Sequence, residues 1–302
     1  MHVDTELLNR HKAHADALFV EHGCFTNWLG VRTDAAIFGN GELFRDRIFP
    51  DIPAGEAGDG VFAGYPEYAA LLTAIEAAPD KQHFIAVELG AGWGPWISAC
   101  GVVCRKLGFE HTTLIGVEAD AGRHRFMQAH MSRNGLMGTP QINCKLVHGA
   151  VWTEDTTLQF PALDPRDSGG AVSADVAERD YRGYETSFVE VQALALSTLC
   201  EGLPAIDYMH CDIQGSELPV LRSAIAWLNA HVRHLFVGTH SRVIDGGLIA
   251  LFYENGWDIL AERPCHFEFD RSIPSLEGMT KADGEIFVRN PRMVGGRQAD
   301  RT

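Results

Sequence analysis

From residue 84 onward, short apolar runs alternate with stretches of helical periodicity, and this alternation limits the fold more than any other feature of the sequence. Strands that alternate with helices are typical of a parallel sheet with helices on both faces. The last two predicted strands have no helix between them, so we expect them to pair antiparallel near one edge. The predicted strands cover residues 84–89, 113–117, 144–148, 188–191, 206–211, 235–239, 257–262 and 285–289, and the predicted helices cover 95–107, 123–134, 217–229 and 248–255. The sequence therefore predicts a doubly wound α/β domain.

The first 80 residues have a different texture. Helical periodicity is visible over 4–22 and again over 65–78, while the glycine-rich stretch between them is irregular. Its second half, residues 51–64, is the best candidate for a linker or flexible lid. We expect residues 1–80 to form a mainly helical and irregular accessory region that caps the site or mediates oligomerisation.

The remaining residues, 81–295, are expected to form a single domain with one interruption. Residues 161–187 are polar and glycine-containing and fit neither a strand nor a helix. A loop of this length inside a compact domain is usually functional or disordered. We expect either an insertion loop that lies over a site or a plain surface insertion.

Composition and charge limit the class of protein. The chain of 302 residues has 25 Lys and Arg against 40 Asp and Glu, a net charge of −15, which disfavours binding to nucleic acid or to an anionic membrane. Its seven cysteines are scattered without a C-x-x-C pair, as in proteins of a reducing compartment. The sequence shows neither a signal peptide nor an apolar run long enough to span a membrane. We therefore expect a cytoplasmic globular protein.

The strongest local signal is a glycine loop that follows the first predicted strand of the domain. The segment reads V-E-L-G-A-G-W-G-P-W over residues 87–96, so an apolar strand runs through Glu88 into a G-x-G-x-G turn and a helix opens at Pro95. Glycine allows a sharp turn and a close approach of the backbone to a ligand. In open α/β sheets the ligand lies beyond the carboxyl ends of the strands, where this turn is placed. The loop is formed by Gly90, Ala91, Gly92, Trp93 and Gly94.

Three ligands compete for such a loop. A dinucleotide fingerprint would need its third glycine at position 95, which is Pro95, and a phosphate-binding P-loop would need a G-K-[ST] ending, which is absent. S-adenosylmethionine has no phosphate but carries an ammonium, a sulfonium and a ribose, and the acidic Glu88 suits those groups. The sequence therefore favours S-adenosylmethionine, with a turn that binds nothing as the structural alternative.

The second predicted strand also ends in an acid. In the segment I-G-V-E-A-D, Glu118 and Ala119 follow the apolar run, one helix after the glycine loop. A carboxylate at that position can accept both ribose hydroxyls. The alternative is a plain helix cap, for which Asp120 is well placed.

Two further strand ends carry groups for chemistry. Asp212 follows the strand over 206–211, and His240 follows the strand over 235–239. A histidine at such a position can take a proton from a hydroxyl, although a structural role is common for a single histidine. A metal set of His210, Asp212, Glu217 and His240 can be imagined, but no ligand spacing reinforces it, so no metal is predicted.

Taken in order, these motifs resemble the FkbM family of S-adenosylmethionine-dependent methyltransferases. The resemblance rests on VELGAGWGPW, on IGVEAD followed by H-M-S-R-N-G-L over 130–136, on H-G-A-V over 148–151, on IDYMHCDIQGSELPVL, and on FVGTHS with Gly-Trp at 256–257. It implies a class I methyltransferase fold, a seven-stranded sheet with one antiparallel strand, and O-methylation of sugars or natural-product hydroxyls. His210, Gln214 and Gly238 stand where members commonly have lysine, glutamate and glutamate, which marks a divergent subgroup on the substrate side.

The expected site follows from these assignments. We expect Glu88 on the methionine ammonium side, the glycine loop beneath the ligand, Glu118 on the ribose, and Gly149 and Ala150 beside the adenine. His240 is the expected base. Asp212 is expected to orient it or to anchor the substrate, and it is also expected among the cofactor-binding residues. The expected partners are a small-molecule or glycan acceptor and, by analogy of fold, a second copy of the chain. A cofactor-binding module without catalysis and a nicotinamide oxidoreductase are the competing hypotheses.

Overall fold

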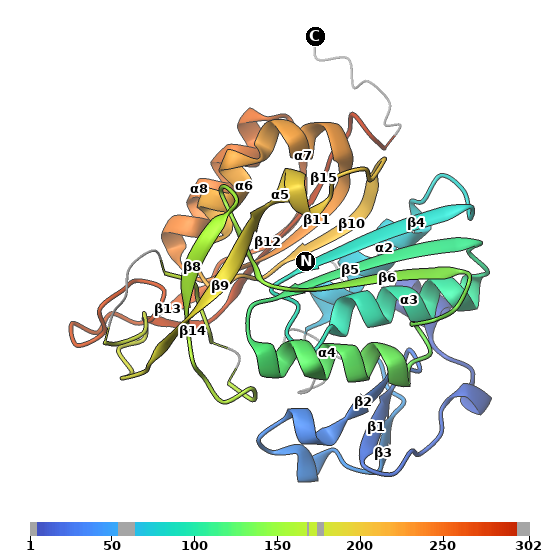
Figure 1. Cartoon of the computed structure of the whole chain (residues 1–302). Coiled ribbons are helices and arrows are strands. Elements are labelled where there is room, and N and C mark those ends of the chain that lie inside the picture. The colour runs from blue at the N-terminus through green and yellow to red at the C-terminus, as the bar shows by residue number, and fades with distance from the viewer. Residues whose placement is uncertain (1–4, 54–63, 168, 174–177, 295–302) are drawn as a thin grey trace.

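A seven-stranded sheet forms the centre of the computed structural model, which describes residues 5–53, 64–167, 169–173 and 178–294. Its order is β12-β15-β11-β10-β4-β5-β6, and β15 alone runs antiparallel to its two neighbours (Figure 1). The predicted mostly parallel sheet with one antiparallel strand near an edge is confirmed. The strands are β4 (His83–Leu89), β5 (His111–Glu118), β6 (Ile142–His148), β10 (Ile206–Cys211), β11 (Val232–Thr239), β12 (Asp258–Arg263) and β15 (Gly284–Arg289).

Helices cover both faces of this sheet because its inner strands are apolar on both sides. Along β4, Phe84 and Ala86 belong to one buried cluster, while Ile85 and Val87 belong to the other. The first cluster includes residues of α2 (Tyr65–Glu76), α3 (Pro95–Leu107) and α4 (Ala121–Arg133). The second includes residues of α5 (Leu196–Leu199), α6 (Glu217–Ser223), α7 (Ile225–His231) and α8 (Arg242–Glu254). Figure 1 shows the two helical layers on opposite sides of the sheet.

A second, smaller sheet lies beside the carboxyl ends of the central strands. It has the order β7-β9-β8, and its strands are β7 (Ala150–Trp152), β8 (Thr156–Pro161) and β9 (Phe188–Ala195). The strand predicted over 188–191 is thus real, but it belongs to this sheet. β9 has several exposed residues, unlike the fully buried β10, and this half-buried pattern suits a strand with one face toward solvent.

The N-terminal region differs from its prediction. The helix expected over 4–22 is short, α1 (Thr5–His11), followed by the single turn η1 (Ala15–Ala17). Within the stretch predicted to be irregular, a three-stranded sheet of order β2-β1-β3 forms around a cluster of phenylalanine rings. Its elements are β1 (Cys24–Asn27), β2 (Arg32–Asp34), η2 (Ala35–Ile37), η3 (Gly41–Leu43) and β3 (Arg47–Phe49). Most of the predicted linker over 51–64 lies outside the described residues.

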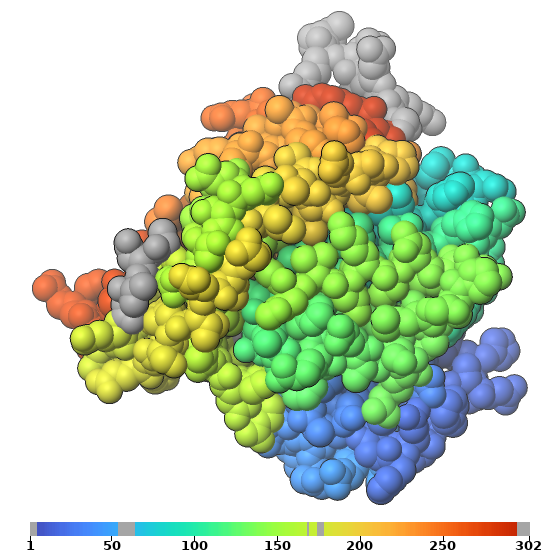
Figure 2. All heavy atoms as spheres, in the orientation of Figure 1, coloured from blue at the N-terminus to red at the C-terminus, as the bar shows by residue number. Residues whose placement is uncertain are grey.

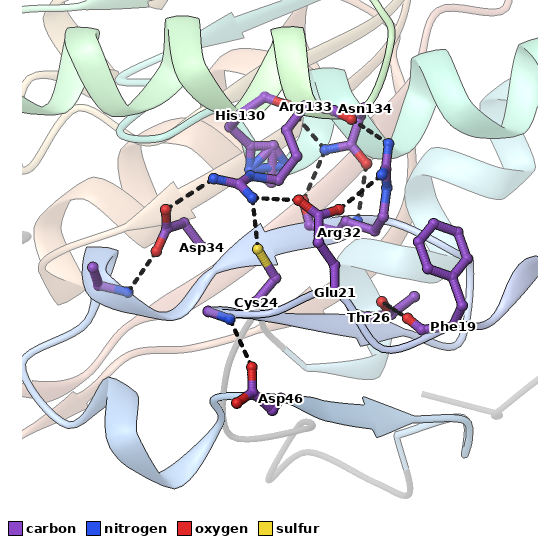
Figure 3. Close-up of polar contacts among 12 residues, drawn as sticks. Phe19, Glu21, Cys24, Thr26, Arg32, Asp34, Asp46, His130, Arg133 and Asn134 are labelled. Atoms are coloured by element: carbon purple, nitrogen blue, oxygen red, sulfur yellow. Dashed lines mark hydrogen bonds and ion pairs between the residues drawn. The ribbon is translucent and has the colours of Figure 1, made fainter.

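This N-terminal sheet is fastened to the end of α4 by polar contacts. Arg133 donates to Glu21 and Asp34 at 2.5 and 3.0 Å, and the side chain of Asn134 bonds both the N–H and the carbonyl of Arg32 at 2.9 Å. Figure 3 shows these side chains of α4 reaching down to the sheet. In Figure 2 the blue N-terminal residues adjoin the green residues around α4. The motif over 130–136 therefore has a structural role here.

The other elements are peripheral. A two-stranded hairpin of β13 (His266–Phe267) and β14 (Thr280–Ala282) precedes β15.

In the part of the chain that the structure describes, no helix combines the length and the apolar character needed to cross a membrane. All seven cysteines are free. Cys100 and Cys104 of α3 are buried in the hydrophobic core, as expected.

Candidate active site

A cavity lies at the carboxyl ends of β4, β5 and β10, between the glycine loop and the second sheet. Most of the residues predicted to bind the cofactor line it, namely Glu88, Gly90, Ala91, Gly92, Trp93, Glu118, Ala119, Gly149, Ala150 and Asp212. Two predicted residues, Gly94 and His240, are not part of its lining. The structure thus brings together groups that are spread over more than a hundred residues of sequence.

The glycine loop is shaped by close backbone approach. Gly90 has φ +72°, and a Cβ at this position would lie 1.8 Å from the carbonyl oxygen of Asp212. Only glycine fits between the ends of β4 and β10 in this conformation. Gly94, with φ +76°, ends the turn as the residue before α3, and Pro95 occupies the first helical position. Gly94 therefore shapes the loop without facing the cavity.

Glu88 lines the cavity and is 2% exposed. Its carboxylate accepts the backbone N–H groups of Trp96 and Ile97 at 3.3 and 2.9 Å, in the first turn of α3. Burial raises the pKa of Glu88 to about 8, although the two N–H donors act in the opposite direction. An ammonium group bound nearby would favour its charged form. The predicted role of Glu88 toward that ammonium stays a prediction.

Glu118 closes the cavity at the end of β5. One carboxylate oxygen accepts the N–H of Gly92 at 2.6 Å, and the other accepts the N–H of Asp120 at 2.7 Å. Each oxygen keeps a further lone pair, so the carboxylate can still accept a pair of hydroxyls. Burial raises the pKa of Glu118. Asp120 caps α4 by accepting the N–H of Arg123. The helix cap that the sequence offered as an alternative at this strand end is therefore present as well.

The second sheet supplies a wall that the motifs did not reveal. Phe160, Leu163, Asp167, Gly170 and Val172 line the cavity, and four of them come from the described part of the insertion loop. Arg182 bonds Asp167 at 2.8 and 3.0 Å and so fixes one part of this loop to another. Part of the insertion loop thus lines the cavity, and the role of the whole loop as a cover over the site stays a prediction.

Asp212 and His240 meet at the ends of β10 and β11. His240 Nε2 lies 3.3 Å from Asp212 Oδ1, and Nδ1 lies 2.9 Å from Glu217 Oε1. Burial alone would lower the pKa of His240, but the charges of Glu217 and Asp212 outweigh it and raise the pKa to about 10. His240 is 3% exposed and stands behind Asp212, which is the member of the pair that reaches the cavity.

Two polar residues of the cavity wall were not predicted as site residues from the sequence. His210 lines the cavity, neither ring nitrogen has a hydrogen-bond partner among the described residues, and the ring stacks at 5.3 Å on Phe236. Burial lowers the pKa of His210 to about 4, so the ring is neutral near pH 7. Glu67 of α2 lies 3.7 Å from it, and burial raises the pKa of this acid. The sequence showed that His210 lies on a strand, but it gave no sign that Glu67 of α2 lies beside it.

Comparison with protein families decides the identity. A model of the methyltransferase FkbM domain matches residues 75–242. The chain belongs to the FkbM methyltransferase family. The match spans the site from Glu88 to His240, so this FkbM protein is a methyltransferase and S-adenosylmethionine is its cofactor. The nicotinamide hypothesis is wrong, and a module without catalysis is not favoured.

The individual proteins that resemble this chain share little sequence identity with it. A protein from Jannaschia sp. (strain CCS1), named "Putative methyltransferase", is 28% identical over 279 residues, which cover 90% of this chain and 94% of that one. Precorrin-6y C5,15-methyltransferase from Geobacter metallireducens GS-15 is 8% identical with a TM-score of 0.42, covering 79% of this chain and 98% of its own. The N-terminal domain of human METTL16 in complex with SAH is 11% identical with a TM-score of 0.39, covering 75% and 69%.

The lining of the cavity fits the cofactor. S-adenosylmethionine carries a positive sulfonium, an ammonium and two ribose hydroxyls, all of which suit acidic acceptors. The described lining residues include one arginine, Arg123, and six acids, namely Glu67, Glu88, Glu118, Asp120, Asp167 and Asp212. A Cβ at Gly90 would collide with the carbonyl group of Asp212, so the loop keeps this shape beside the cavity only with glycine there. Glu118 and the glycine loop would hold the cofactor, which would supply an electrophilic methyl group.

Proposed function

We propose that this FkbM methyltransferase methylates a hydroxyl group of a sugar, a glycan or a small natural product. The observation that carries the proposal is the pairing of Asp212 with His240, because it puts a proton-accepting unit at the cavity wall beside the glycine loop. A hydroxyl needs such a unit to lose its proton during methyl transfer. The net charge of −15 further supports an acceptor other than nucleic acid.

The two residues divide the work by position. Asp212 contacts the cavity and meets the acceptor hydroxyl, while His240 lies behind Asp212 and is itself held by Glu217. His240, the base predicted from the sequence, has a pKa of about 10 and already carries a proton near neutral pH, so Asp212 receives the proton as the oxygen attacks the methyl group. Holding the reactants in line can lower the barrier by about 7–11 kcal/mol. The cavity wall of aromatic and glycine residues would restrict how the reactants lie and would exclude water from them.

The acceptor class can be tested with cofactor carrying a ¹³C-labelled methyl group. The full-length protein is incubated with a panel of hydroxylated sugars and small hydroxylated metabolites, and products are examined by NMR. We expect a labelled methyl group bonded to oxygen. A labelled methyl group on nitrogen, sulfur or carbon, or turnover on none of the hydroxyl panel, overturns the proposal.

The proton-accepting pair is tested with Asp212→Asn and His240→Gln. Both variants should lose about 100-fold or more in turnover, the usual range for a positioned base. S-adenosylhomocysteine affinity, measured by calorimetry, should stay within about threefold because neither side chain holds the nucleoside half of the cofactor. His266→Gln, an exposed change in β13, serves as the control. Full turnover in either site variant contradicts the assignment.

A further inference from the structure

Two carboxylate oxygens lie within 4 Å of one ring nitrogen beside the cavity. His240 Nε2 lies 3.3 Å from Asp212 Oδ1 and 3.9 Å from Asp283 Oδ1. The Nε2 atom is buried and has no hydrogen-bond partner within the described parts of the chain. Asp212, Glu217 and His240 each offer a ligand atom, and these atoms lie within 4.8 Å of one another. Asp283 comes from the turn between β14 and β15, far along the chain from the other groups.

The other ring nitrogen fixes how His240 is used. Nδ1 lies 2.9 Å from Glu217 Oε1, and the same oxygen accepts the backbone N–H groups of Ile213 and Gly215, both at 3.0 Å. Glu217 is fully buried and is held as an acceptor by these donors. Nδ1 therefore donates its proton to Glu217, and Nε2 is directed toward Asp212 and Asp283, where it holds a proton or, once that proton is lost, offers a lone pair.

Two carboxylates beside a buried ring nitrogen favour a positive species there, which is either a proton on Nε2 or a cation that replaces it. We propose that this species is a divalent metal ion, held by His240 Nε2, Asp212 and Asp283. Glu217 completes the arrangement in which a carboxylate orients a metal-bound histidine through its second nitrogen. One imidazole and two carboxylates suit first-row divalent ions such as Mn²⁺. This proposal departs from the sequence analysis, which predicted no metal. Asp283 is distant in sequence from the other ligands, so no local motif pointed to it.

The role of the ion rests on the proposed function. Asp212 also lines the cavity, so the ion would lie where the acceptor hydroxyl meets the pair. A divalent ion lowers the pKa of an oxygen bound to it, which makes a hydroxyl a better nucleophile near neutral pH. Binding of the ion itself requires neither the cofactor nor an acceptor. Its test is therefore independent of the identity of the acceptor.

The alternative occupant is a proton on His240, and binding measurements separate the two. Mn²⁺ is titrated into the full-length protein without cofactor, and free Mn²⁺ is followed by electron paramagnetic resonance. We expect saturable binding that weakens about tenfold or more in His240→Gln and in Asp283→Asn. Asp283 has a side chain that is 60% exposed, so its variant tests the site even if the buried histidine variant does not fold.

The control is His266→Gln, which removes an exposed histidine that lies 3.6 Å from Glu268. This variant should bind Mn²⁺ as the wild type does. Wild-type protein that binds no Mn²⁺, or binding that is equal in the wild type and in Asp283→Asn, overturns the metal site. Mn²⁺ binding without methyl transfer to any hydroxyl would support the site and overturn the proposed function alone.

Discussion

At the scale of single residues, Gly90 is the position that the cofactor loop tolerates least. The backbone of the loop touches the end of β10 there, so its restriction combines a positive φ with a steric conflict. Gly108, at the end of α3, has a similar φ of +76°, but apart from its own chain neighbours no atom of the described residues lies within 4 Å of where its Cβ would stand. Substitutions at these two glycines therefore distinguish the cost of a positive φ, which both share, from the cost of a steric conflict, which only Gly90 has.

We predict that Gly90→Ala destabilises the protein far more than Gly108→Ala. The positive φ costs about 1–2 kcal/mol in either variant, and the contact with Asp212 adds about 1–3 kcal/mol at position 90. Urea unfolding measures both changes, and calorimetry with S-adenosylhomocysteine should show weakened binding for Gly90→Ala alone. Equal losses of stability for the two variants would show that the close approach does not matter.

At the scale of elements, the end of α4 holds the N-terminal sheet. Asn134 is 2% exposed and replaces a missing strand neighbour for β2, because its amide bonds both backbone groups of Arg32. Unpaired backbone groups at a buried contact cost about 1–3 kcal/mol each. This amide therefore explains why a short three-stranded sheet stays in place on the helix.

We predict that Asn134→Ala lowers the free energy of unfolding by about 2–4 kcal/mol. Hydrogen exchange should show faster exchange in residues 24–49, where the sheet loses its attachment. Asn143→Ala in β6 changes an exposed asparagine and provides the control, with an expected loss of about 0.5 kcal/mol. Unchanged exchange in β1–β3 of the Asn134 variant would contradict this account of the attachment.

At the scale of the whole molecule, the cavity joins three separate parts of the chain. The glycine loop comes from the central sheet, Glu67 comes from α2, and Phe160 comes from the second sheet. The predicted boundary at residue 80 separates α2 from the domain, yet α2 packs in the same buried cluster as β4 and α3. The site therefore depends on the assembly of all three parts.

We predict that S-adenosylhomocysteine slows hydrogen exchange in all three parts together. Peptides from residues 65–76, 89–97 and 158–173 should gain protection, because their residues line one cavity. The β13–β14 hairpin, whose residues are all described, lies outside the cavity lining and should exchange as before. Protection confined to the glycine loop would show that the second sheet and α2 do not close on the cofactor.

Local patterns in the sequence were enough to predict the central sheet, the glycine loop and the strand ends that carry Glu118, Asp212 and His240. These patterns are the alternation of apolar runs with helical periods, a turn that needs glycine, and the rule that ligands lie at the carboxyl ends of parallel strands. The same patterns also carried the family resemblance, which the family match confirmed.

The surroundings of those strand ends depend on tertiary packing and could not be predicted in the same way. The strand over 188–191 lies in a second sheet instead of the central one, and an irregular stretch forms the N-terminal sheet, because short strands depend on neighbours distant in sequence. Asp283 meets His240 for the same reason, and Glu67 of α2 reaches His210 of β10. Contacts between distant segments are set by how the elements pack, which local periodicity does not encode.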